Sequence, residues 1–137
     1  MKIVSISENK KIEKRIAITP EIAKKYITTG FEVSIPKNYG EHLGFKDDDY
    51  KRLGVNIFNN ENEILIGADV IVQLGLPSEE KISHIKENQT LIGIFNPYNN
   101  KEEINILVKK NINVLSLELL PRITRAQSMD ILSSQAN

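Results

Sequence analysis

The sequence predicts an α/β protein with three layers, in which helices cover both faces of a mostly parallel, Rossmann-like sheet. Apolar runs of four to six residues recur along the whole chain. The polar stretches between them place apolar residues at helical spacing. Strand signals that alternate with helix signals in this way are typical of parallel sheets built from strand–helix–strand units.

The apolar runs predict six strands. The first follows Met1 directly, and the fourth is bounded by Gly67 on one side and by Gly75 and Pro77 on the other. The predicted strands are residues 2–6, 31–35, 55–58, 68–74, 90–95 and 113–117.

The first helix has clear start and stop signals. Thr19 is suited to cap its N-terminus, Pro20 to fill the first helical position, and Glu21 to face the positive end of the helix dipole. Gly30 is expected to end it. Residues 36–45 hold glycine, proline and asparagine and are expected to form a loop.

Later helices are predicted mainly from their capping residues. The acidic runs at 47–49 and 79–80 are interpreted as helix starts rather than cation sites, because negative charge is favoured there. The expected caps are Asp47, Asn60 with Glu63, Ser78, and Asn100 with Glu103. A last helix is expected over 126–134, and the chain stops after it without a cap, which suggests a fragment boundary.

Composition narrows the function classes. The 137 residues suit one α/β domain, and 18 basic residues balance 18 acidic ones, so no nucleic-acid partner is expected. The absence of cysteine excludes disulfides and thiolate chemistry and agrees with a cytoplasmic location. His42 and His84 have no partner at ligand spacing, so no metal site is expected.

A glycine-rich dinucleotide fingerprint is missing. Such a fingerprint follows a strand directly, so that the backbone can approach a pyrophosphate at a helix N-terminus. Gly40 and Gly44 have neither that spacing nor a strand before them. We therefore expect residues 1–137 not to hold NADH appreciably.

Two polar segments are candidates for ligand binding. Arg15 lies in the loop after the first strand, where α/β proteins bind ligands, although pairing with Glu13 or Glu8 to fix the loop is slightly favoured. Gln127, Asp130 and Ser133 recur every three residues along one predicted helix, in the second segment.

That second segment also has an ordinary interpretation. Thr124 and Gln127 suit a capping box, and Asp130 suits a pair with Arg122 or Arg125. On periodicity alone, this structural interpretation is the better one.

The exact order of residues in 121–137 favours a functional interpretation instead. Pro-Arg-Ile-Thr-Arg-Ala-Gln-Ser-Met-Asp-Ile-Leu-Ser-Ser-Gln-Ala-Asn resembles the signature of transhydrogenase alpha subunits almost letter for letter. Weaker similarity to the same family covers the rest of the chain, at residues 13–20, 30–33 and 69–77.

The resemblance implies roles for residues of this segment. Arg122 and Ser133 would hold the carboxamide region of the NAD(H) nicotinamide, and Asp130 would fix Arg122. Gln127 would reach toward NADP(H) on a partner domain. Cofactor binding is thus implied for all four, and a catalytic role for Gln127, Arg122 and Asp130.

The resemblance also implies an assembly. Residues 1–137 would be the N-terminal subdomain of the NAD(H)-binding component of a proton-translocating NAD(P) transhydrogenase, without its Rossmann half and inactive alone. The complete component would be a homodimer, peripheral to the inner membrane on its cytoplasmic side. Its partners would be the transhydrogenase membrane domain and the NADP(H)-binding beta subunit.

Two alternatives stay open. Alanine dehydrogenase resembles this family in architecture, but its substrate-binding Lys is absent from residues 72–77 here, and its catalytic His from residues 94–97. Without a cationic anchor and an acid/base group, amino-acid oxidation lacks its machinery. The other alternative is a non-catalytic remnant or dimerisation module.

Overall fold

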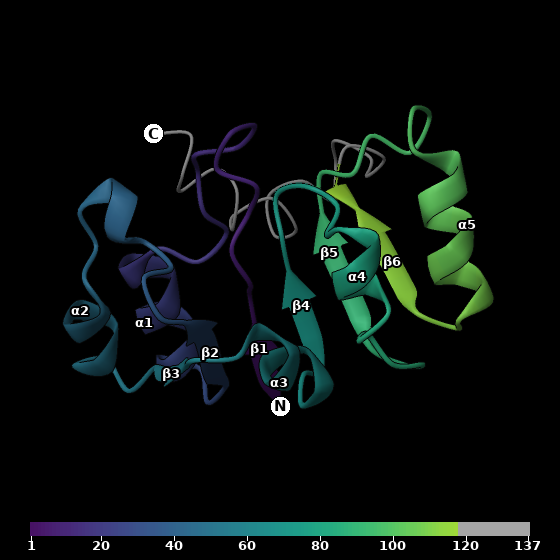
Figure 1. Ribbon diagram of the computed structural model, residues 1–137. Helices are drawn as coiled ribbons and strands as arrows, with labels where there is room; N and C mark the ends of the chain where they lie inside the picture. The colour runs from purple at the N-terminus through teal and green to yellow at the C-terminus, as the bar shows by residue number, and fades with distance from the viewer. Residues whose placement is uncertain (118–137) are drawn as a thin grey trace.

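The computed structural model of the chain describes residues 1–117, which form a six-stranded sheet (Figure 1). All neighbouring strands pair in parallel, in the order β3-β2-β1-β4-β5-β6. The chain builds outward from β1 to β3, then returns to the other side of β1 to start β4. The strands are β1 (Lys2–Val4), β2 (Glu32–Pro36), β3 (Asn56–Phe58), β4 (Val70–Val72), β5 (Thr90–Gly93) and β6 (Asn113–Ser116).

Helices cover both faces of the sheet, which confirms the predicted three-layer α/β class. Successive strand residues point to opposite faces, so Ile3 joins the core under α1 and α2, whereas Val4 joins the core under α3, α4 and α5. Within residues 1–117, no helix has the length and apolar character needed to cross a membrane. The helices are α1 (Pro20–Thr28), α2 (Asp47–Lys51), α3 (Glu61–Ile66), α4 (Glu79–Ile82) and α5 (Lys101–Lys109), with a 3₁₀ turn at Glu41–Leu43.

Helix α1 begins and ends as predicted. The Thr19 hydroxyl accepts a hydrogen bond from the Ile22 amide at 3.3 Å, and Pro20 fills the first helical position. Gly30 adopts a φ of 106°, and its amide donates to the Ile27 carbonyl while the Phe31 amide donates to the Tyr26 carbonyl. This pair of bonds is a Schellman motif, which uses the conformational freedom of glycine to stop the helix.

The first strand ends earlier than predicted. The sequence predicts strand over 2–6, but β1 ends at Val4. The reason is a side chain: the Ile6 amide donates to Gln73 Oε1 at 2.7 Å, in place of a neighbouring strand's carbonyl. The chain therefore leaves the sheet near Ser5 and begins the loop to α1.

Two predicted caps are wrong in detail. The N-cap of α2 is Lys46, whose amide donates to Asp49 Oδ2 at 2.9 Å, whereas both Asp47 oxygens accept from the Asn38 amide. Asn100 occupies the N-cap of α5, but its side chain donates to the Phe95 carbonyl at 2.9 Å instead of capping the helix. In both cases a loop that packs on the helix start captures the side chain.

The N-caps expected at Asn60 and Ser78 are present. The Asn60 side chain accepts from the Asn62 amide at the start of α3, and the Ser78 hydroxyl accepts from the Lys81 amide at the start of α4. The acidic runs at 47–49 and 79–80 lie in the first turns of α2 and α4, as predicted.

Candidate functional site

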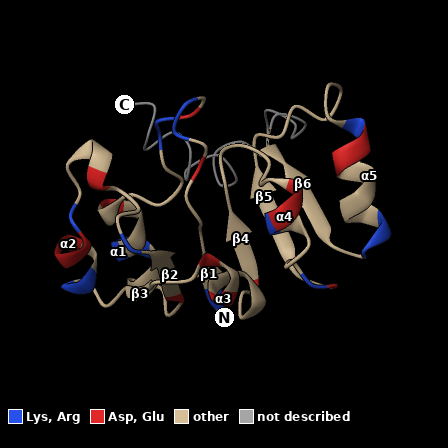
Figure 2. Cartoon of the chain, in the orientation of Figure 1, with Lys and Arg blue, Asp and Glu red and all other residues tan. Residues whose placement is uncertain are grey.

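The strand order places a topological switch point between β1 and β4. Because these neighbouring strands connect onward to opposite sides of the sheet, a crevice forms beyond their carboxyl ends, where doubly wound proteins bind ligands. The β1–α1 loop and the β4–α4 loop meet at this edge (Figure 1). The β1–α1 loop carries both signs of charge in Figure 2. The candidate site is therefore built from these two loops.

A carboxylate occupies the centre of the crevice. Glu8 Oε2 accepts hydrogen bonds from the Leu74 amide at 2.8 Å and from Gln73 Nε2 at 2.8 Å, and Oε1 accepts from the Gly75 amide at 3.1 Å. Burial raises the pKa of Glu8 above its ordinary value, and the nearby Glu13 adds to the rise, although the three hydrogen bonds oppose it. The Glu8 carboxylate thus occupies the amide donors that could otherwise bind an anion.

Gln73, directly after β4, links Glu8 to the residues that follow β1. Its side chain is 1% exposed and every polar atom is used: Nε2 also donates to the Ile6 carbonyl at 3.1 Å, and Oε1 accepts from the Ser5 hydroxyl at 3.0 Å. The amide side chain suits this place because it donates on one side and accepts on the other.

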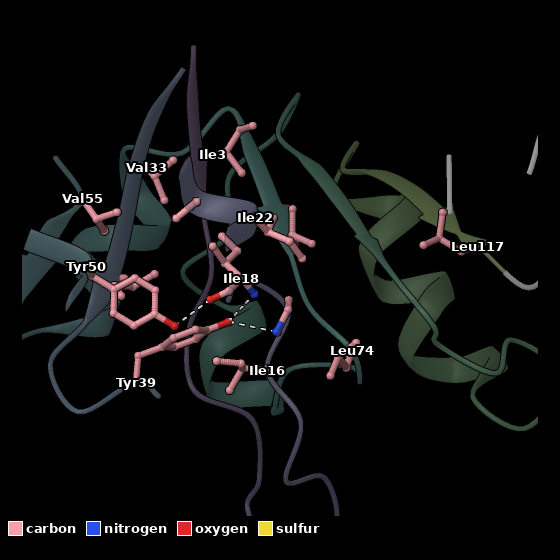
Figure 3. Close-up of a cluster of buried hydrophobic side chains, with 14 residues drawn as sticks. Ile3, Ile16, Ile18, Ile22, Val33, Tyr39, Tyr50, Val55, Leu74 and Leu117 are labelled. Atoms are coloured by element: carbon pink, nitrogen blue, oxygen red, sulfur yellow. Dashed lines mark hydrogen bonds between the residues drawn. The ribbon is translucent and has the colours of Figure 1, made fainter. Parts of the chain in front are cut away.

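Two buried tyrosines hold the far end of the β1–α1 loop (Figure 3). The Tyr39 hydroxyl accepts from the Ala17 and Ile18 amides, both at 3.1 Å, and donates to Ser5 Oγ at 2.8 Å. The Tyr50 hydroxyl donates to the Ile18 carbonyl at 2.8 Å. Burial keeps the pKa of Tyr39 far above its ordinary value, so this hydroxyl remains neutral.

Arg15 is paired within its own loop. Its guanidinium donates to both oxygens of Glu13, from Nε at 3.1 Å and from Nη2 at 2.9 Å, and this contact lowers the pKa of Glu13. The structure thus shows the Glu13 pairing that the sequence favoured. The Arg15 side chain is 53% exposed, so it also remains accessible to solvent.

A cavity of about 280 Å³ lies beside Glu8 at the switch point. Glu61 closes one wall: Oε2 accepts from the Ser7 amide at 2.7 Å, and Oε1 lies 3.3 Å from Lys81 Nζ. The charged residues that line it are Glu8, Glu61 and Lys81. Two carboxylates against one ammonium make this cavity unsuited to a pyrophosphate.

The histidines are engaged in ordinary surface contacts. His42 Nε2 lies 2.7 Å from the Lys14 carbonyl, and His84 Nε2 lies 3.7 Å from Glu80. Among the residues that the structure describes, no group of three or more histidine and acidic side chains is arranged to hold a metal ion.

The residues predicted to bind cofactor lie outside the described part of the chain. Arg122, Gln127, Asp130 and Ser133 all follow residue 117, as does the helix expected over 126–134. The Glu8 network was not predicted from the sequence. Its one visible signal is Gln73, a polar residue inside the apolar run at 68–74.

We expect Glu8 to contribute to the pH dependence of folding. Because its pKa in the folded chain is raised above 4.5, the folded state binds this proton more tightly than the unfolded state does. The free energy of unfolding should therefore fall as pH rises from about 4.5 through the raised pKa. Glu8→Gln should lack this fall. Urea unfolding of both proteins from about pH 4 to about pH 8 measures it, and parallel pH curves would contradict it.

Comparison with known proteins identifies the family. The family model described as alanine dehydrogenase/PNT, N-terminal domain, matches residues 5–137. The chain belongs to this family. The resemblance on which the sequence interpretation rests is thereby confirmed.

Relatives within the family differ in their degree of likeness. An NAD(P) transhydrogenase alpha subunit of Rickettsia prowazekii is 40% identical over all of this chain, which spans 37% of that relative. Alanine dehydrogenase 1 of Staphylococcus aureus is 27% identical over 99% of this chain and 36% of its own length. The crystal structure of transhydrogenase from Sinorhizobium meliloti superposes with a TM-score of 0.84 at 36% identity, covering 98% of this chain and 40% of the other. This family member is thus more similar to these transhydrogenases than to the dehydrogenase.

Proposed function

We propose that this chain is the front part of the NAD(H)-binding component of a proton-translocating transhydrogenase. The observation that carries the proposal is the 40% identity to a transhydrogenase alpha subunit over the full chain. Since the chain spans 37% of that relative, the activity belongs to a larger protein. Hydride would pass there between NAD(H) and NADP(H), coupled to proton movement across the membrane.

The switch point supports a division of labour between this chain and a dinucleotide-binding half. A pyrophosphate needs free amide donors at the end of a strand, but Glu8 engages the Leu74 and Gly75 amides. These two amides are therefore not available to the diphosphate of a dinucleotide. In the proposed component, the dinucleotide-binding half holds NAD(H) and this chain forms the facing wall.

The segment after β6 is proposed to supply contacts to the nicotinamide. Strand β6 ends at Ser116, and because the sheet is parallel, it ends at the same edge as β1 and β4. The end of β6 therefore lies at the ligand-binding edge, and residues 118–137 follow it in the sequence. Arg122 and Ser133 would hold the carboxamide region, Asp130 would orient Arg122, and Gln127 would face NADP(H).

Direct hydride transfer suits this set of residues. The nicotinamide cofactors supply the hydride chemistry, so the protein has to orient the rings and exclude water, and needs no proton-transfer group at the reacting carbons. Amide, guanidinium and hydroxyl groups meet that need. The complete component is proposed to be a homodimer at the cytoplasmic face of the membrane, acting with the membrane domain and the NADP(H)-binding beta subunit.

Substitution of Gln127 tests this function. In the component extended through its dinucleotide-binding half, and mixed with the NADP(H)-binding partner, Gln127→Asn should lower the rate of hydride transfer about tenfold, because a shorter side chain misplaces the rings. NADH affinity should be unchanged. Gln135→Asn, in the same segment, is the matched control. An unchanged rate for Gln127→Asn would contradict this role and favour the interpretation of Gln127 as part of a helix cap.

An alanine dehydrogenase activity is the second candidate, because the matching family includes that enzyme and a relative of 27% identity carries its name. The residues of the two corresponding segments weigh against it. Residues 72–77 contain no Lys, and their polar side chain, Gln73, is fully engaged with Glu8, Ser5 and Ile6. Residues 94–97 contain no His, and Phe95 there is buried in the core under α3, α4 and α5. Neither segment offers a cation or a titrating base. Alanine formation from pyruvate, ammonia and NADH by the extended component would overturn our choice.

A further inference from the structure

One continuous chain of buried hydrogen bonds links the β4–α4 loop to the far end of the β1–α1 loop. Ser5 and Tyr39 are 0% exposed and Gln73 is 1% exposed, so water does not compete for the bonds that join these three side chains. From the far end, the donors and acceptors run from the Ala17 and Ile18 amides through Tyr39, Ser5 and Gln73 to Glu8.

The backbone amides at the far end set the direction of the hydrogen bonds in this network. Backbone amides can only donate, so the Tyr39 oxygen accepts from both and its single proton goes to Ser5 Oγ. The Ser5 hydroxyl then donates onward, to Gln73 Oε1 at 3.0 Å, with the Ile6 carbonyl at 3.4 Å as the longer second contact. Because Gln73 accepts at Oε1, its Nε2 faces Glu8, to which one Nε2 proton is donated while the other goes to the Ile6 carbonyl. Along this path the donated protons point toward the Glu8 carboxylate, and such aligned bonds strengthen one another.

The network connects three places that are distant in sequence. Glu8 begins the β1–α1 loop, Ala17 and Ile18 end it, and Leu74 and Gly75 belong to the β4–α4 loop. The loop that carries Arg15 is thus held near its start by the β4–α4 loop and at its end by Tyr39, which follows β2.

We propose that Glu8 is a positioning residue, which holds the whole β1–α1 loop in register with the β4–α4 loop through Gln73, Ser5 and Tyr39. The inference rests on the proposed function in one respect: the edge held in this way is the wall that faces the cofactors. Charged and titratable groups around Glu8 are Glu13, Arg15 and Tyr39, together with Glu61 and Lys81, which line the same cavity.

Amide hydrogen exchange on the chain of residues 1–137 tests the network without any cofactor. Glu8→Gln places an NH₂ group among donors, so exchange at Leu74 or Gly75 should accelerate. The decisive readout is at Ala17 and Ile18, where we expect about tenfold faster exchange, the effect of losing roughly one hydrogen bond. Glu61→Gln is the matched control, because Glu61 holds the same loop at the Ser7 amide but lies outside the network. It should leave Ala17 and Ile18 unchanged.

Chemical rescue separates positioning from general destabilisation. Glu8→Ala leaves space for a small carboxylate beside the Leu74 and Gly75 amides, so acetate should restore slow exchange at Ala17 and Ile18. Chloride at the same ionic strength should not. In the extended component, Glu8→Gln should lower kcat for hydride transfer about tenfold with KM for NADH unchanged, because the cofactor is bound by the other half but oriented against this wall.

The outcomes distinguish the two proposals. Unchanged exchange at Ala17 and Ile18 in Glu8→Gln, or equal effects of Glu8→Gln and Glu61→Gln there, would overturn the network. Altered exchange with an unchanged kcat would overturn the positioning role alone. A wild-type component that transfers no hydride would overturn the proposed function and leave the exchange result standing.

Discussion

Gly93→Ala is expected to lower the free energy of unfolding by about 3 kcal/mol, because β5 has no room for a side chain at this position. A Cβ built on Gly93 would overlap the Gln73 carbonyl oxygen and lie 2.5 Å from Phe95 Cε1. The carbonyl belongs to the backbone directly after β4, and it cannot turn aside as a flexible side chain would. The substitution should therefore push β4 and β5 apart.

Urea unfolding measures this loss, and Gly67→Ala is the matched control. Gly67 has a negative φ of −89°, and its nearest neighbour to a new Cβ is the Glu63 carbonyl at 3.9 Å. The free energy of unfolding should change by no more than about 0.5 kcal/mol in this control. Similar losses at both glycines would show that the crowding at Gly93 relaxes easily.

Tyr39→Phe should cost about 3 kcal/mol of folding free energy, since it removes the hydroxyl that accepts from two buried amides. The ring stays in place, and its edge-to-face contact with Tyr50 is kept. The Ala17 and Ile18 amides lose this partner in a site that water does not reach. Unsatisfied buried donors bear the full cost of desolvation, whereas a lost exposed bond does not.

Tyr50→Phe provides the comparison for Tyr39→Phe. Both hydroxyls are fully buried, but Tyr50 donates one bond, to the Ile18 carbonyl, and satisfies no backbone amide within residues 1–117. Its removal should cost about 1 kcal/mol. Thermal or urea unfolding of both variants gives the difference. Equal losses would mean that the Ala17 and Ile18 amides find other acceptors.

Local patterns explain why much of the fold was predictable. Strand positions follow from apolar runs, and the ends of α1 follow from Thr19, Pro20 and Gly30, whose effects reach only a few residues. Predictions failed where a distant group intervenes. Asp47 was expected to cap α2, but the Asn38 amide from the preceding loop engages it.

The candidate site was less predictable for the same reason. Tyr39 lies 34 residues from Ser5, and Ser5 lies 68 residues from Gln73, so no window of the sequence contains the network. Gln73 in an apolar run signalled a buried polar contact but not its partners. The assignments to Arg122, Gln127, Asp130 and Ser133 came from the family resemblance, and they remain predictions.

The fixed direction of the buried hydrogen bonds also constrains how this protein can evolve. Position 73 must donate on one side and accept on the other, and position 5 must accept a hydrogen bond from position 39 and donate one to position 73. An apolar residue at position 73 would remove this acceptor of the Ser5 hydroxyl, and a carboxylate there would remove the donor to Glu8. Among homologues, residues 5, 39 and 73 should therefore be exchanged as a set, and chimeras that mix one set with another should fold less stably than either parent.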